Sequence, residues 1–66
     1  MKIELNGVTR EVERSTTVGR LLDDLGLQRD GIAVAVGMQV VPRGEQDSRQ
    51  LEPGDRVEII QAVGGG

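Results

Sequence analysis

The order of polar and apolar residues predicts a β-hairpin early in the chain. Polar and apolar residues alternate over residues 2–5, Asn6-Gly7 follows, and alternation resumes over residues 9–13 around Val12. Alternation with a period of two is typical of a strand with one buried face, and Asn-Gly favours a tight hairpin turn because both residues tolerate positive φ. We therefore expect strands near residues 2–6 and 8–13.

A short amphipathic helix is predicted next. Residues 15–17, Ser-Thr-Thr, offer hydroxyl groups that can cap a helix, and Gly26 stands where a C′ glycine usually ends one. Gly19 weakens such a helix by roughly 1 kcal/mol relative to Ala, so packing against the rest of the protein must hold it. The apolar residues that recur at i, i+3, i+4 and i+7 are Val18, Leu21, Leu22 and Leu25.

Two apolar runs follow the predicted helix. Residues 32–36 are continuously apolar between Gly31 and Gly37, as expected of a central strand covered on at least one face. Residues 39–41 form a second run that ends at Pro42. Because proline cannot donate a backbone hydrogen bond, this second strand should be short and lie at an edge, or stop there.

The last third of the chain predicts a loop and one more strand. Residues 43–50 are polar and aperiodic, which indicates a loop with room for a turn of helix, and Leu51 should anchor it to the core. Pro53-Gly54 fits the centre of a type II turn before a final strand over residues 56–63. One sheet and one helix then share a single core, which is an α+β architecture.

Composition excludes several classes of function. A chain of 66 residues is expected to form one domain. It has no cysteine or histidine, so it lacks thiolate nucleophiles, imidazole bases and the usual zinc ligands, and we expect neither enzymatic activity nor a bound metal or cofactor. The net charge of −3 and the absence of aromatic residues argue against nucleic acid. Without a leader or a membrane-spanning stretch, we expect a cytoplasmic protein that does not contact membranes.

The candidate chemistry lies at the end of the sequence, in Gly64, Gly65 and Gly66. Three residues without side chains form a narrow, flexible tail that could reach a catalytic site in another protein and leave its last carbonyl group uncrowded. The same residues could also be a frayed end or a remnant of cloning. On composition alone the two interpretations stay open.

Six segments support the first interpretation. They are Asn6-Gly7, residues 17–27, 33–36, 41–43 and 53–60, and the terminal Gly-Gly. In this order and at this length they resemble the ThiS family of sulfur carriers in thiamin thiazole biosynthesis. The resemblance implies a ubiquitin-like β-grasp fold, with a mixed sheet of four to five strands packed on one helix. It places the β-grasp domain at residues 1–63 and a flexible tail at 64–66.

The resemblance also implies a mechanism in which the chain is a carrier and not an enzyme. A ThiF-like enzyme would use its own ATP to adenylate the Gly66 carboxylate, and sulfur would then replace oxygen to give a thiocarboxylate. The thiocarboxylate would donate sulfur to a ThiG-like thiazole synthase. Gly64 departs from relatives that carry another small residue there, which should add flexibility without changing the chemistry.

An apolar surface near the tail is predicted to dock the activating enzyme. If Val57 and Ile59 point to the core, the period of two turns Ile60 to the opposite face. By resemblance to β-grasp carriers, an apolar residue at this position helps docking, although a single exposed isoleucine is also ordinary. The free chain is expected to be a monomer. The predicted docking residues are Ile60, Ala62, Val63 and Met38, with Val40 as a further candidate.

Three alternatives remain open on sequence. A ThiS-like carrier could instead serve molybdopterin, cysteine or natural-product sulfur chemistry, because the tail chemistry is shared. A ubiquitin-like modifier would undergo the same activation but end as an isopeptide bond between Gly66 and lysine. A plain interaction module would keep its function after loss of Gly65 and Gly66.

Overall fold

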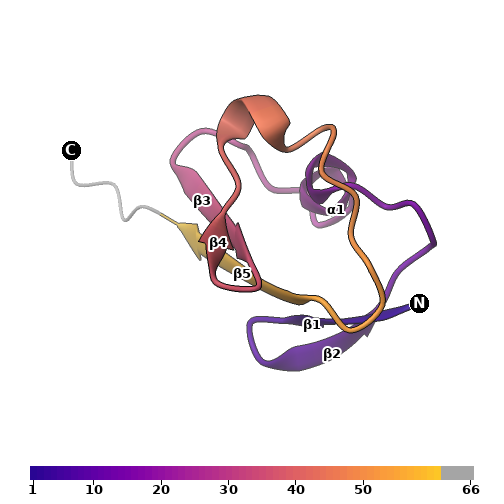
Figure 1. Cartoon of the computed structure of the whole chain (residues 1–66). Helices are drawn as coiled ribbons and strands as arrows, with labels where there is room; N and C mark the ends of the chain where they lie inside the picture. Colours follow the sequence, from indigo (N-terminus) through magenta and orange to yellow (C-terminus); the bar gives the residue numbers. More distant parts are fainter. Residues whose placement is uncertain (62–66) are drawn as a thin grey trace.

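The computed structural model describes residues 1–61, which form a five-stranded mixed sheet with one helix against it (Figure 1). The order of strands is β2-β1-β5-β3-β4. The β-grasp fold is expected to have a mixed sheet of four to five strands packed on one helix. The structure confirms this expectation, with five strands. Residues 62–66, which include the predicted boundary between domain and tail, lie outside the described residues. The elements are β1 (Lys2–Leu5), β2 (Val8–Glu11), α1 (Val18–Asp24), β3 (Ile32–Val36), β4 (Gln39–Val40), a 3-10 helix (Arg43–Glu45) and β5 (Arg56–Gln61).

Strand β5 is central and joins two hairpins. It pairs parallel with β1 through two residue pairs and antiparallel with β3 through five. The β1–β2 turn has φ of 47° at Asn6 and 83° at Gly7, as the Asn-Gly signal predicts. Strand β4 is short and lies at an edge, which confirms the expectation drawn from Pro42. In the described residues, only β5 connects the two hairpins within the sheet.

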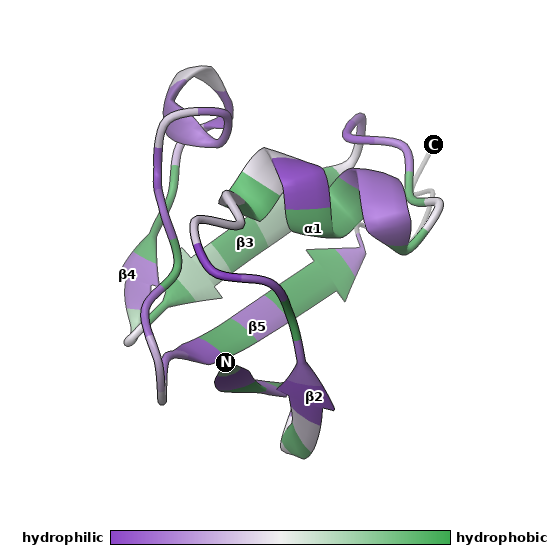
Figure 2. Ribbon diagram, turned by 90° about the vertical axis from the view of Figure 1, so that its right-hand side faces the viewer, coloured by the Kyte–Doolittle hydropathy of each residue, from purple (hydrophilic) through white to green (hydrophobic). Residues whose placement is uncertain are grey.

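Helix α1 covers one face of the sheet and closes the core (Figure 2). Its residues Val18, Leu21 and Leu22 are buried, and Leu25 packs partly against them. These are the four positions that the apolar period predicted. The core is aliphatic, as the composition requires, and the sheet and the segments beside it supply its remaining buried members: Ile3, Val34, Val36, Val41, Leu51 and Val57.

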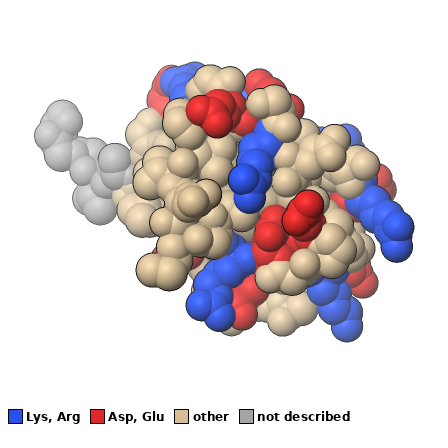
Figure 3. Space-filling model, viewed as in Figure 1, with Lys and Arg blue, Asp and Glu red and all other residues tan. Residues whose placement is uncertain are grey.

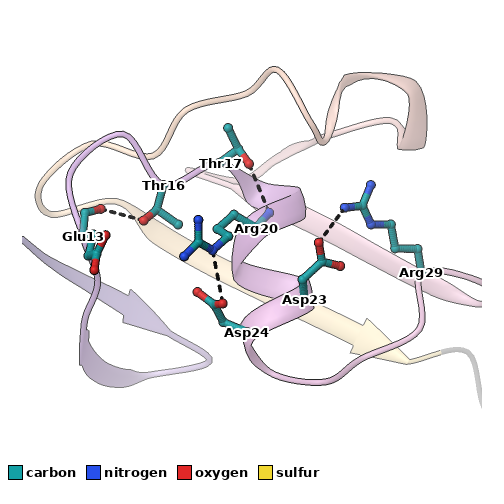
Figure 4. A network of polar contacts seen from close by, with 7 residues as sticks. All are labelled: Glu13, Thr16, Thr17, Arg20, Asp23, Asp24 and Arg29. Carbon is teal, nitrogen blue, oxygen red and sulfur yellow. Dashed lines mark hydrogen bonds and ion pairs between the residues drawn. The ribbon is translucent and has the colours of Figure 1, made fainter.

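Local residues fix both ends of α1. The Thr17 hydroxyl oxygen accepts a hydrogen bond of 3.1 Å from the Arg20 amide, so Thr17 is the predicted cap (Figure 4). At the other end Gly26 has φ of 71°, and the Leu27 amide donates to the Leu22 carbonyl at 3.0 Å. With the bond from the Gly26 amide to the Asp23 carbonyl, these contacts form a Schellman motif.

The segment 43–50 has a role that the polar pattern did not predict. Its backbone carbonyls cap α1, because the Val18 amide donates to the Arg49 carbonyl at 3.0 Å and the Gly19 amide to the Gln46 carbonyl at 2.8 Å. Leu51 is buried, as expected, but the Gln46 side chain is a second anchor, at 2% exposure. Glutamine is mostly an exposed residue, so the sequence held no signal for this burial.

The contact between segment 43–50 and α1 also explains why residue 19 is a glycine. A Cβ atom at Gly19 would lie 2.2 Å from Asp47 Oδ1 and 2.6 Å from the Arg29 guanidinium. Arg29 bridges the segment and the helix, with ion pairs of 2.8 Å to Asp47 and 3.4 Å to Asp23, the second drawn in Figure 4. Hydrogen bonding to Asp47, with the charges of both carboxylates, raises the pKa of Arg29 above its ordinary value. Gly19 lowers the intrinsic stability of the helix, but its missing side chain leaves room for Arg29, whose ion pairs with Asp23 and Asp47 connect the helix to segment 43–50.

Replacing Gln46 with methionine should stabilise the domain. The Gln46 Oε1 atom is buried and has no hydrogen-bond partner among the described residues. Gln46→Met keeps a similar volume and removes this unsatisfied acceptor, so the free energy of unfolding in urea should rise by about 1 kcal/mol. The exposed Gln28→Met variant is the control and should change it by less than about 0.5 kcal/mol. A loss of stability in Gln46→Met would show that the amide is needed.

Candidate functional site

The face of the sheet opposite α1 carries exposed apolar residues close to the end of β5. Val57 is fully buried and Ile59 partly buried, so Ile60 points away from the helix and is 60% exposed. This confirms the predicted orientation of Ile60. It lies beside Ala33, its partner on β3.

Four residues form what we call the outer patch: Ile60, Ala33, Ala35 and Val40. Val40 is 72% exposed and pairs with Ala35, while Ile60 pairs with Ala33. The exposed Glu58, which pairs with Ala35 from the side of β5, borders the patch. Strand spacing and rise place Ile60 and Val40 about 12 Å apart. The space-filling view shows uncharged side chains over β3, β4 and the end of β5 (Figure 3).

A shallow hollow continues from the outer patch toward the start of β3. Ile60, Ala33 and Ile32 give it an apolar lining, and Arg29 and Arg43 border it. Both arginines have carboxylate partners, since Arg43 pairs with Asp30 and Arg29 with Asp47. The border is therefore close to neutral, and the hollow suits an apolar side chain of a partner better than an anion.

The structure separates Met38 from Ile60. Met38 is 85% exposed but lies in the β3–β4 turn with φ of 70°. The preceding Gly37 amide donates to the Arg56 carbonyl at 2.9 Å, so this turn lies beside the start of β5, four residues and about 13 Å along the strand from Ile60. Val40 is the nearer candidate, and the docking role of Met38 stays a prediction. The other predicted residues, Ala62, Val63, Gly64, Gly65 and Gly66, lie outside the described residues.

The alanines of the outer patch were missed as candidates. In residues 32–36 every position is apolar, so the pattern of polarity does not distinguish the two faces. Side-chain size does, because the larger Ile32, Val34 and Val36 share the inner face, whereas Ala33 is exposed and the half-buried Ala35 lies on the same outer face as Ala33. Considering side-chain size as well as polarity would have identified Ala33 and Ala35 as members of the outer patch.

The described part of the chain lacks both a cluster of metal-ligating side chains and a helix suited to a membrane. Residues 1–61 contain no group of three or more histidine, cysteine or carboxylate side chains placed to hold a metal ion. Over the same residues, no helix has the length and apolar character needed to cross a membrane.

Comparison with known proteins places the whole chain among sulfur carriers. The model of the ThiS family matches residues 3–66. The sulfur carrier protein ThiS of Escherichia coli K12 is 30% identical over 66 residues, which are the full length of both chains. A crystal structure of the thiamine biosynthesis protein ThiS from Geobacter metallireducens superposes with a TM-score of 0.87 at 30% identity, again over all of both chains.

Two longer relatives are thiazole synthases. Those of Paramagnetospirillum magneticum and Magnetococcus marinus are 35% and 38% identical to this chain over 66 residues. The chain spans only 20% of the length of each. A segment similar to this whole chain is thus part of a synthase polypeptide in both organisms.

Proposed function

Because the chain belongs to the ThiS family of sulfur carriers, we propose that it holds sulfur as a thiocarboxylate on Gly66 and donates it in thiamin biosynthesis. The observation that carries this proposal is the match to the Escherichia coli sulfur carrier over the full length of both chains. The chain acts as a protein co-substrate, and the catalytic groups belong to its partners.

The chemistry begins with activation of a poor electrophile. In an adenylating enzyme of the ThiF type, the Gly66 carboxylate attacks the α-phosphorus of ATP, and pyrophosphate leaves. A sulfur nucleophile at the sulfide level, such as hydrosulfide, then attacks the acyl carbon of the adenylate. The bond from that carbon to the AMP oxygen breaks, AMP leaves, and loss of the proton on sulfur gives the thiocarboxylate. Gly64 and Gly65 offer no side chain that would obstruct either attack.

The acceptor we propose is a thiazole synthase of the ThiG type. The support comes from the two synthases that contain a segment similar to this chain, because joining two proteins in one polypeptide keeps a donor close to its acceptor. In the present case the carrier and the synthase would meet as separate molecules or as domains of one polypeptide.

The outer patch is the proposed docking surface for the adenylating enzyme. Ile60 precedes the end of the described chain by one residue, so a partner bound there would hold the root of the segment that leads to Gly66. Aliphatic side chains around a shallow hollow are suited to a desolvated contact, which usually supplies most of the binding energy of an interface.

A charge at Ile60 should weaken activation selectively. Ile60→Glu places a carboxylate in the proposed contact, so the KM of the adenylating enzyme for the carrier should rise about tenfold or more. The measurement is pyrophosphate release at varied carrier concentration. Val8→Glu is the matched control, because Val8 is 68% exposed but lies on β2, at the far edge of the sheet, and should leave KM unchanged. An unchanged KM in folded Ile60→Glu would remove Ile60 from the interface.

Intact mass tests the proposed function itself. Incubation with a ThiF-like enzyme, ATP and a sulfur source should raise the mass of the chain by the difference between sulfur and oxygen. Absence of any gain, with adenylate formation also absent, would contradict the proposal. Recovery of Gly66 joined to lysine in cell extracts, without sulfuration, would instead identify a protein modifier.

A further inference from the structure

The side chain of Asn6 contacts β5 close to its end. The Ile59 amide donates to Asn6 Oδ1 at 2.9 Å, and Asn6 Nδ2 donates to the Ile59 carbonyl at 3.3 Å. The Asn6 backbone amide also donates to the Val57 carbonyl at 2.9 Å. One residue of the β1–β2 turn therefore makes three hydrogen bonds to the strand that carries Ile60.

These hydrogen bonds take the place of pairing with β1, which ends before β5 does. β1 pairs with β5 only as far as Leu5 and Val57, and the chain then turns away at Asn6. In a strand, alternate residues direct their amide and carbonyl groups to the same side, so Ile59 directs both groups to the side that β1 has left. A carboxamide has the same donor and acceptor as a peptide group. The Asn6 side chain thus occupies the place of the next residue of a strand.

The turn alone does not account for asparagine. Asn6 has φ of 47°, a conformation that glycine adopts at least as readily. Glycine would therefore serve the turn equally well but would leave the Ile59 amide and carbonyl without the partners they have among residues 1–61. The Asn6 side chain therefore serves the contact with β5 in addition to the turn.

We infer that Asn6 is a positioning residue for activation, which holds the end of β5 in register so that Ile60 stays on the outer face and Gln61 stays opposite Ile32 of β3. This inference rests on the proposed function. A strand end that is already ordered spares the adenylating enzyme the cost of ordering it on binding. Asn6 need not touch the enzyme or the reacting atoms to have this effect.

The test compares Asn6→Gly with the parent protein. Glycine keeps the turn conformation and deletes only the carboxamide. Hydrogen exchange of the Ile59 amide, measured by NMR, should become about fivefold faster, and the KM for the carrier in adenylation should rise about fivefold, with kcat within about twofold of the parent. Asn6→Asp keeps the acceptor for the Ile59 amide but replaces the Nδ2 donor with an oxygen that faces the Ile59 carbonyl, so it should restore only part of the protection and of the affinity.

Thr17→Ala is the control for stability. It removes the helix cap, with an expected cost of about 1 kcal/mol, and lies on the helix, away from the hydrogen bonds to β5. Its KM should equal that of the parent. An equal rise of KM in Thr17→Ala and Asn6→Gly, or no rise in Asn6→Gly, would overturn the inference. If the parent itself is not adenylated, all variants fail alike; the proposed function then falls, and the positioning role falls with it.

Discussion

One alanine added after Gly66 should abolish the gain of sulfur. The added residue moves the carboxylate away from Gly66 and puts a side chain on the residue that must be activated. The peptide carbonyl that remains at Gly66 cannot be adenylated. After incubation with the adenylating enzyme, ATP and a sulfur source, the intact mass of this variant should stay unchanged.

Removal of the alanine provides the control for that experiment. A carboxypeptidase that trims the extended chain back to Gly66 should restore the gain of mass, and thermal unfolding should show the same stability before and after trimming. If the extended chain gained sulfur as readily as the parent without being trimmed, Gly66 would not be the site of modification, and the proposed mechanism would be wrong.

Truncating Leu22 should bring the domain close to unfolding. Leu22 is fully buried between α1 and the sheet, and changing a buried leucine to alanine typically costs about 2–5 kcal/mol. Small domains have little to spare, because stability scales as about 0.05–0.15 kcal/mol per residue. Urea unfolding of Leu22→Ala should therefore show a much lower midpoint, or no cooperative transition at all.

The matched control for Leu22 lies on the exposed side of the same helix. Asp24→Ala removes an exposed ion pair with Arg20, of a kind that contributes about 0–1 kcal/mol. Its midpoint should stay near that of the parent. A loss of less than about 1 kcal/mol in Leu22→Ala would mean that α1 does not close the core in solution.

Local signals predicted the positions of the elements. The Asn-Gly turn, the Thr17 cap and Gly26 each act within a few residues, so they can be recognised from the sequence. Gly54 confirms the last turn, with φ of 84° and a bond of 3.0 Å from the Asp55 amide to the Glu52 carbonyl. The helical period also identified the four core positions of α1.

Contacts between distant segments were not predictable in the same way. Backbone carbonyls at Gln46 and Arg49 cap the helix, and every residue type has such a carbonyl, so no pattern marks them. The separation of Met38 from Ile60 depends on the register of β3 against β5, which a single sequence does not reveal. The outward orientation of Ile60, by contrast, followed from the period of a strand.

The central place of β5 links folding to the completeness of the polypeptide. A ribosome makes both hairpins before it makes residues 56–61, yet among the described strands only β5 holds those hairpins together. A chain that stops short of Arg56 would lack the buried Val57 and the strand that pairs with both hairpins, so too little sheet and core would remain for a stable fold. Proteases would remove such fragments, so the cell would keep only molecules in which residues 56–61 had been made.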